Sequence, residues 1–160
     1  ARALPYGCSY KKRRPIPPAR KFAIETDRSE PGTIDVRRPP PESSNSPIVI
    51  NMFAQWELGP ALKYNRIKCP RIHGPDSSLN REVWFQKCLD NITNLGEDKP
   101  ASIAFPHRIG CGLAGGNWPK YEAMIQAFAD RNPDVQVTIA RWLYSLVRSR
   151  RSRSPVGCTH

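Results

Sequence analysis

The stretch from Ile103 to Trp118 constrains the fold most, because three local signals follow one another there. A short apolar run of the β type, 102–105, leads into a loop that carries four glycines within residues 110–116. An amphipathic helix follows at once. Glycine tolerates positive φ and lets a ligand approach the backbone, so that successive N–H groups can converge on an anion. This order predicts a strand, an anion-binding loop and a helix whose N-terminus adds further free donors.

The wider hydrophobic pattern predicts a single domain of the α/β class. A first helix is expected from an N-cap among residues 76–78 to about Leu95, and a second one after Asn117. The near-continuous apolar run 48–53 is typical of a strand that is covered on both faces. The apolar stripe of the second helix comprises Tyr121, Met124, Ile125 and Phe128. The expected strands are 33–36, 48–53, 102–105 and 135–139.

The net charge of +11 is concentrated at the two ends of the chain. Residues 1–21 carry seven basic and no acidic side chains, and residues 141–160 carry five arginines and no acid. Residues 22–140 hold 13 basic and 14 acidic groups, so the body is close to neutral. Basic ends neutralise phosphates irrespective of sequence, which leaves a non-catalytic nucleic-acid-associated binding protein as an alternative function. A solvated terminal run without a partner is the simpler interpretation.

Composition divides the chain into three parts. Residues 1–47 form a basic, proline-rich segment with one short strand, expected at the edge of the domain. Residues 48–141 form the α/β body, and the Arg/Ser-rich residues 142–160 are expected to be a disordered tail. No apolar run is long enough to span a bilayer, so no membrane partner is expected.

The five cysteines are Cys8, Cys69, Cys88, Cys111 and Cys158. They show neither a C-x-x-C pair nor a histidine at metal-ligand spacing, so we expect no metal site. An odd number without a disulfide framework favours reduced thiols and an intracellular protein, in the cytoplasm or the nucleus. For Cys111, among the glycines, a small buried thiol is a simpler role than a nucleophile.

The glycine loop fits neither of the two common nucleotide-binding patterns. The Lys-Ser/Thr pair of a Walker loop is absent, and the glycine spacing differs from G-x-G-x-x-G. A tight strand-to-helix turn without a ligand is the alternative, but four glycines exceed what a turn requires. The residues alone therefore predict a phosphate ester as the ligand.

The segment Ile103–Ile125 resembles the macro-domain family. The residues that carry the resemblance are Ile109-Gly-Cys-Gly-Leu113, Trp118 and Met124-Ile125. The branch that it resembles most contains the terminal ADP-ribose protein glycohydrolase and the ADP-ribose phosphate phosphatase. The resemblance spans roughly residues 30–140. It implies a three-layer α/β/α domain with a mixed central sheet and a ligand cleft at the strand ends.

The resemblance also implies ADP-ribose or a related nucleotide as the partner, no cofactor, and a monomer. If the chain is an enzyme, the implied activity is hydrolysis of ADP-ribose phosphate or of ADP-ribosyl groups. The loop residues that would wrap the diphosphate and the distal ribose are Gly110, Cys111, Gly112, Leu113 and Ala114. Gly115, Gly116 and Asn117 would flank them, and Phe53, Ala54 and Gln55 would lie at an adjacent strand end.

Two departures from the family bear on catalysis. The glycohydrolase branch has an acidic residue directly after Gly-Cys-Gly-Leu, where this chain has Ala114, and alanine cannot act as a general base. The family's first strand and the Gly/Ala-rich loop after it are expected to precede Ala1, so we expect a fragment that lacks part of the pocket. Binding without turnover is therefore an alternative, as is a scaffold that binds nothing.

Two side chains near the loop are weak catalytic candidates. His107 could act as an acid or base near neutral pH, or it could be an ordinary hydrogen-bonded loop histidine. Asn117 is suited to cap the following helix and to contact the ligand as well. Trp118 is interpreted as a packing anchor. Gln55 and Trp56 follow a strand, and ligands bind at strand ends in open α/β sheets. A ligand contact and a purely structural role are equally open to both residues.

Overall fold

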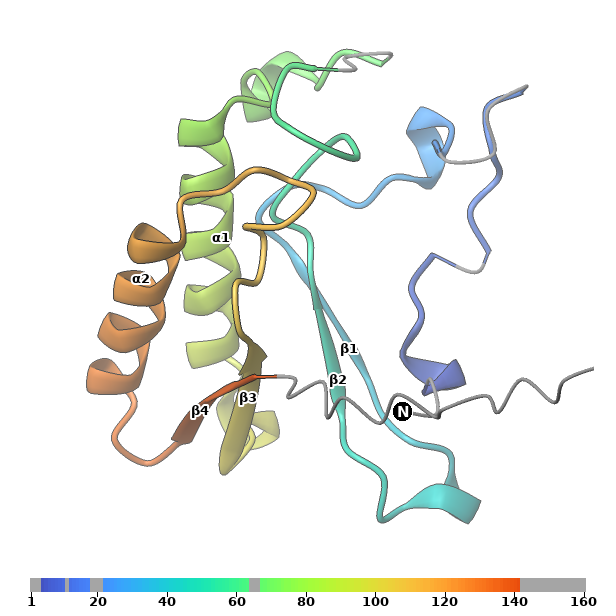
Figure 1. Ribbon diagram of the computed structural model, residues 1–160. Coiled ribbons are helices and arrows are strands. Elements are labelled where there is room, and N and C mark those ends of the chain that lie inside the picture. The colour runs from blue at the N-terminus through green and yellow to red at the C-terminus, as the bar shows by residue number, and fades with distance from the viewer. Residues whose placement is uncertain (1–3, 11, 18–21, 64–66, 142–160) are drawn as a thin grey trace, which may run out of the picture.

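The structure is a computed structural model that describes residues 4–10, 12–17, 22–63 and 67–141. Helices and strands are mixed in it as a small α/β fold, which confirms the expected class (Figure 1). Every expected helix and strand is present, with its ends within about two residues of the predicted ones. The expected tail, 142–160, lies outside the described residues. The strands are β1 (Ile34–Arg37), β2 (Val49–Met52), β3 (Ser102–Pro106) and β4 (Gln136–Ala140), and the helices are α1 (Ser78–Thr93) and α2 (Trp118–Arg131).

The four strands form two separate two-stranded sheets. β1 runs antiparallel to β2 with Ile34 opposite Met52, and β3 runs parallel to β4 with Ser102 opposite Gln136. α2 lies between β3 and β4 in the chain, because parallel strands need a crossover connection. The macro-domain resemblance implies a mixed central sheet, but no ladder joins β2 to β3 within the described residues. The two sheets are linked through side chains, since both contribute to one hydrophobic core.

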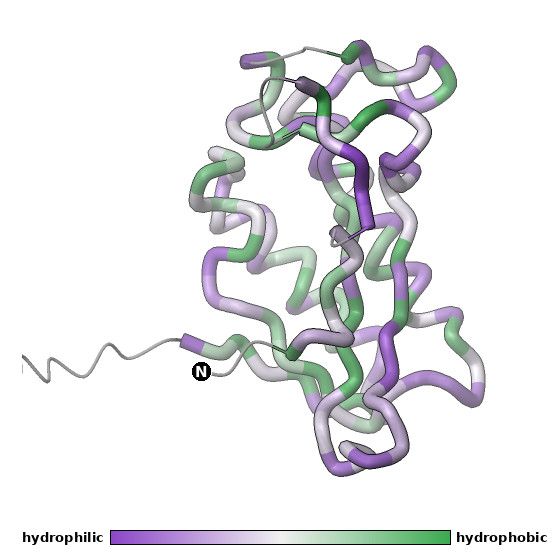
Figure 2. The backbone as a smooth tube through the Cα atoms, turned by 90° about the vertical axis from the view of Figure 1, so that its right-hand side faces the viewer, coloured by the Kyte–Doolittle hydropathy of each residue, from purple (hydrophilic) through white to green (hydrophobic). Residues whose placement is uncertain are grey.

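β2 is covered on both faces, as expected, but by different kinds of structure. Ile50 and Met52 pack against the hydrophobic core. On the other face, the Asn51 side chain donates a hydrogen bond to the carbonyl of Gly7 at 3.0 Å. A Cβ at Gly7 would lie only 2.8 Å from Cγ2 of Val49, so the N-terminal chain is in close contact with the strand. Figure 2 shows this chain in front of the sheet, and because it is a thin cover, the β2 residues stay half-buried.

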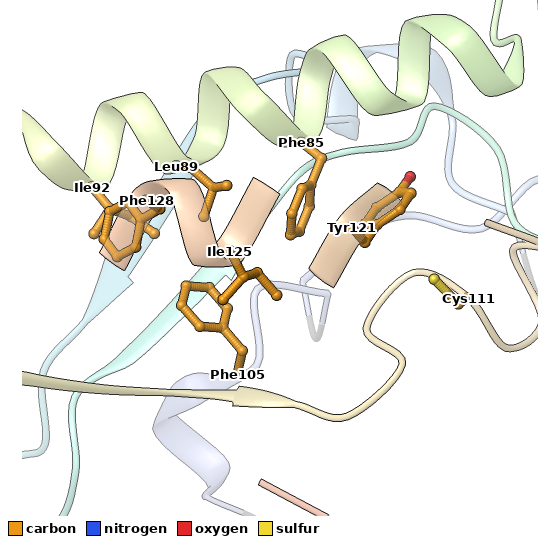
Figure 3. Close-up of a cluster of buried hydrophobic side chains, with 8 residues drawn as sticks. All are labelled: Phe85, Leu89, Ile92, Phe105, Cys111, Tyr121, Ile125 and Phe128. Atoms are coloured by element: carbon orange, nitrogen blue, oxygen red, sulfur yellow. The ribbon is translucent and has the colours of Figure 1, made fainter. Parts of the chain in front are cut away.

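The hydrophobic core lies between the two helices and β3 (Figure 3). Its buried helical side chains are Phe85, Leu89 and Ile92 from α1, with Tyr121, Ile125 and Phe128 from α2. Phe105 of β3 meets Phe128 edge-on with ring centroids 6.0 Å apart, and Phe85 lies 4.6 Å from Tyr121. Such aromatic pairs add to the free energy gained by burial. The predicted stripe of α2 is confirmed, with Met124 half-buried at its edge.

Both helices begin at the end of the molecule where β2 and β3 end (Figure 1). The Ser77 side chain accepts the N–H of Asn80 and caps α1, and the Asn117 side chain accepts the N–H of Lys120 and caps α2. Both caps agree with the sequence pattern. A helix N-terminus carries unpaired N–H groups and the positive end of the helix dipole, so this end of the fold attracts anions.

The proline-rich N-terminal segment folds back on itself in its described part. Arg14 pairs with Asp27 at 2.7 Å, and the hydrogen bonds from Arg14 lower the pKa of Asp27 to about 2. Pro15 and Ala23 form an isolated antiparallel bridge. These contacts give local structure to an extended, proline-rich segment whose sequence has no apolar periodicity.

We expect Phe128→Ala to lower the free energy of unfolding by about 3–5 kcal/mol, because it empties a site that is 0% exposed. Urea denaturation followed by circular dichroism measures this change. Val83→Ala on the 45% exposed face of α1 is the control, with an expected change within about 0.5 kcal/mol. A loss at Phe128 as small as that at Val83 would contradict the assigned core.

Candidate functional site

A pocket of about 400 Å³ lies at the end of the fold where both helices begin. One wall is the chain directly after β2, and the opposite wall is the glycine loop, residues 109–117. Side chains from α1 and α2 complete the lining. The pocket therefore joins two segments that sequence reasoning assigned to one site from positions far apart in the chain. The expected ligand residues that line it are Phe53, Ala54, Gln55, Gly110, Ala114, Gly115, Gly116 and Asn117.

Three other expected ligand residues of the loop do not line this pocket. Cys111 is 6% exposed and belongs to the hydrophobic core. Leu113 is 71% exposed, and Gly112 is exposed beside it. The loop thus presents its first glycine and its last residues to the pocket, and its middle to the core or to solvent.

Two glycines are required by the way the loop doubles back. Gly110 has a φ of 69°, and a Cβ there would lie 3.0 Å from Cε1 of Tyr121. A Cβ at Gly116 would lie 2.7 Å from the carbonyl oxygen of Gly110, and the Gly116 N–H donates to that same oxygen at 3.1 Å. Gly112 differs, because a Cβ there would meet no atom within 4 Å. Gly115 also adopts a positive φ, of 72°, so Gly112 is the glycine of this loop at which a side chain meets neither a contact nor backbone strain.

The free backbone donors of the loop point to its chemistry. The N–H groups of Gly110, Ala114 and Asn117 have no acceptor among the described residues, and all three residues line the pocket. Free donors in a glycine-rich turn beside a helix N-terminus form a concave anion-binding site. The arrangement can hold a group that presents several charged oxygens.

Arg81 of α1 fixes both walls of the pocket. It is 3% exposed and pairs with Asp76, with Nε 2.5 Å from Oδ1 and Nη2 2.6 Å from Oδ2. Its Nη1 donates to the carbonyl of Gly59 at 2.6 Å and to that of Ala114 at 3.4 Å. Nη2 also donates to the carbonyl of Glu57 at 3.1 Å. One buried guanidinium thus links the chain after β2 with the glycine loop.

Glu82 and Lys120 line the pocket but did not stand out in the sequence. Nζ of Lys120 on α2 lies 2.9 Å from Oε2 and 3.1 Å from Oε1 of Glu82 on α1. The lysine side chain is 57% exposed and the glutamate side chain 15%. The sequence held one signal for Glu82. It stands three residues before Phe85, so a charged residue occupies the apolar stripe of its helix.

Two other reactive side chains near the loop are held in their protonated forms. Burial raises the pKa of Tyr121 to about 12, with smaller contributions from Cys111 and Glu82. Burial also raises the pKa of Cys111, against the opposing effect of Arg108. Neither group is therefore ready to act as a base or nucleophile at neutral pH.

His107 lies outside the residues that line the pocket. Its ring packs edge-on against Trp118 with centroids 5.0 Å apart, and its backbone N–H donates to the carbonyl of Ala140 at 2.8 Å. Trp118 is half-buried against the core, as a packing anchor would be. Trp56 donates from Nε1 to the carbonyl of Ile67 at 2.9 Å, which is a structural contact.

A second pocket of about 380 Å³ adjoins the first and shares Tyr10, Phe53 and Gln55 with it. Arg28 and Glu57 form an ion pair at its wall, and both side chains are nearly fully buried. The shared residues make the two pockets neighbours on one surface, with aromatic side chains between them.

Within the described ranges, no three His, Cys, Asp or Glu side chains gather as metal ligands would. No helix in the same residues is long and apolar enough to cross a bilayer. No protein-family model matches the chain, and no curated protein or solved structure is significantly similar to it. The macro-domain resemblance therefore stays a prediction from the residues of the glycine loop.

We expect Arg81→Ala to lower the free energy of unfolding by about 3–5 kcal/mol, because it leaves Asp76 charged, buried and unpaired. Chemical denaturation measures the loss. Arg131→Ala is the control, since its ion pair with Asp90 joins side chains that are 51% and 43% exposed and is worth less than about 1 kcal/mol. Similar losses in the two variants would contradict the role given to Arg81.

Proposed function

We propose that this chain binds ADP-ribose, or a related nucleotide phosphate ester, in the pocket beside the glycine loop. The observation that carries the proposal is that three of the residues lining the pocket, Gly110, Ala114 and Asn117, have backbone N–H groups without an acceptor within the described residues. Phosphate oxygens suit such a set, because they are charged and offer several lone pairs. The N-termini of α1 and α2 lie at the same end of the fold and add a positive electrostatic potential that favours an anion.

The size of the site suits a nucleotide better than a free phosphate ion. Pockets of about 400 Å³ and 380 Å³ each fall within the usual range for small-molecule sites, about 300–1,000 Å³. Tyr10 and Phe53, which both pockets share, offer aromatic surface to a base or a ribose. We assign the diphosphate to the glycine loop and the rest of the ligand to these shared residues.

The same proposal covers the architecture, for which we infer a macro-like α/β/α arrangement of three layers. The order β2, α1, β3, glycine loop, α2, β4 supports it, together with a pocket at the ends of β2 and β3. An intracellular monomer is the form in which we propose that the chain acts.

The nucleic-acid alternative receives no comparable support within the described residues. Arg14 pairs with Asp27, and the guanidinium of Arg13 lies 4.3 Å from the centre of the Tyr10 ring. Both guanidinium groups therefore have partners within the chain. The arginines of residues 148–153 lie outside the described part.

Titration calorimetry of the full chain with ADP-ribose tests the binding proposal. We expect saturable heat with one site per chain, and weaker binding of AMP and of ribose 5-phosphate, because each of them occupies only part of the two pockets. Circular dichroism first establishes that the sample is folded. A folded sample that gives no heat with millimolar ADP-ribose would overturn the assignment.

We expect Gly116→Ala to weaken ADP-ribose binding by at least about tenfold, or about 1.4 kcal/mol. The new Cβ would lie 2.7 Å from the carbonyl oxygen of Gly110, so the loop must change shape. Gly112→Ala is the matched control, because its Cβ meets no atom within 4 Å, and its Kd should stay within about twofold of the original. If both variants lose the same affinity, the geometry of the loop is not what binds the ligand.

A further inference from the structure

We propose a second binding site, for a phosphate group, centred on the guanidinium of Arg13 in the N-terminal segment. The site lies outside the pocket beside the glycine loop, in two further pockets that share Phe53 with it. The site itself does not depend on the proposed function. Its use by the same nucleotide that binds the glycine loop does rest on that function.

Two aromatic rings hold the Arg13 guanidinium in place. Its Cζ lies 4.3 Å from the centre of the Tyr10 ring and 5.5 Å from the centre of the Phe53 ring. The two rings meet edge-on, with their centroids 6.5 Å apart. Such cation–π contacts restrict the side chain of an arginine without occupying its N–H donors. The positive charge is therefore positioned before a ligand arrives.

Most donors of this guanidinium are unused. Nη2 of Arg13 donates to Oγ of Ser29 at 2.9 Å, and no carboxylate pairs with Arg13 within the described residues. The next residue differs, because Arg14 pairs with Asp27 at 2.7 Å. The remaining N–H groups of Arg13 form a planar fork, which can bind two oxygens of one oxyanion.

A third pocket, of about 390 Å³, gives this fork room for a ligand. Arg13 and Ser29 line both the second and the third pocket, and Lys12 lines the third. The carboxylates on its wall belong to Asp27 and Asp35, and each is paired with an arginine at 2.7 Å. The charges of Lys12 and Arg13 have no such partner in the part of the chain that the structure describes. The wall therefore carries an excess of positive charge that an anion can compensate.

A phosphate group matches these donors better than a carboxylate does. The Ser29 hydroxyl accepts from Arg13, which leaves its own proton free to donate to a further oxygen. Lys12 lines the same pocket and adds a second positive charge. A phosphate monoester carries up to about two negative charges and three acceptor oxygens, whereas a carboxylate offers one charge and two oxygens.

The Arg13 site continues the row of pockets that begins at the glycine loop. Phe53 lines all three pockets, and Tyr10 and Gln55 line the first two. In the proposed binding mode these shared residues hold the adenosine part of the ligand. A phosphate on the adenosine ribose would then lie on the side of Arg13, and arginine is the usual partner of such a phosphate in dinucleotide sites. The nucleotide that uses both sites is therefore one with a second phosphate on that ribose, and a free phosphate ion is the other source of the same group.

The first experiment tests the site without a nucleotide. In the ¹⁵N-labelled full chain, inorganic phosphate is titrated at constant ionic strength while the guanidinium Nε–H signals are followed by NMR. The Arg13 signal is identified by its absence in Arg13→Lys, and we expect it to shift and saturate. Arg38 is the matched control, because its side chain is 53% exposed, pairs with Asp98 and lines none of the three pockets. Its signal should not saturate.

The second experiment asks whether the nucleotide carries the phosphate. Titration calorimetry compares ADP-ribose with ADP-ribose 2′-phosphate, and we expect the second ligand to bind at least about tenfold more tightly. Arg13→Gln should abolish this difference and change the Kd of ADP-ribose by less than about threefold, because the loop donors are unaltered. Arg38→Gln removes the same charge outside the pockets and should leave both Kd values within about twofold.

The outcomes separate the Arg13 site from the proposed function. A saturating Arg13 shift without a gain from the 2′-phosphate supports the site, with a free phosphate ion as its ligand. A gain that Arg13→Gln abolishes supports the site, with the nucleotide as its ligand. The site is overturned if neither effect occurs, if Arg38 responds like Arg13, or if the gain persists in Arg13→Gln, and ADP-ribose binding would still stand. If the folded chain binds no ADP-ribose but the Arg13 signal saturates with phosphate, the binding proposal fails and the second site stands.

Discussion

The buried ion pair between Arg81 and Asp76 is the interaction on which the pocket depends. A guanidinium can leave water only if its donors find acceptors, and here a carboxylate and three backbone carbonyls take that role. The carbonyls belong to the chain after β2 and to the glycine loop, so one side chain sets both walls. The core positions α1, and α1 positions Arg81. Stability and site geometry are therefore coupled in this fold.

The same coupling explains the composition of the loop. Phe105 packs in the core immediately before the loop begins, and Tyr121 packs against Phe85 immediately after it ends. The Tyr121 ring comes so close to Gly110 that a Cβ there would lie 3.0 Å from it. The carbonyl of Gly110 in turn excludes a Cβ at Gly116. The need for these two glycines follows from core packing, and the free N–H groups follow from the path that only glycine permits.

The sequence predicted those features whose signals are local, such as the helices, the strands and the Asn117 cap. It did not predict that the strands divide into two sheets. Whether β2 pairs with β3 depends on contacts between segments that lie far apart in the chain. Glu82 and Lys120 were not identified from the sequence, since they are 38 residues apart in the chain and only the fold brings them together. Leu113 was assigned to the site by the macro-domain resemblance, and a sequence pattern does not show which side of a loop faces a pocket. Arg81 escaped notice for a related reason, since its acceptors lie in two other segments.

The charged side chains around the pocket cancel in pairs, Arg81 with Asp76 and Lys120 with Glu82. In the proposed site a phosphate would therefore meet little net side-chain charge, and its affinity would come from backbone N–H groups and helix N-termini. Those donors are fixed in direction, so they select an anion whose oxygens match their positions, whereas a mobile cation attracts any anion. Fixed dipoles also need no reorganisation when negative charge grows on a phosphoryl group. A phosphate ester in this pocket, as we propose it, would therefore be held by donors whose directions the fold fixes.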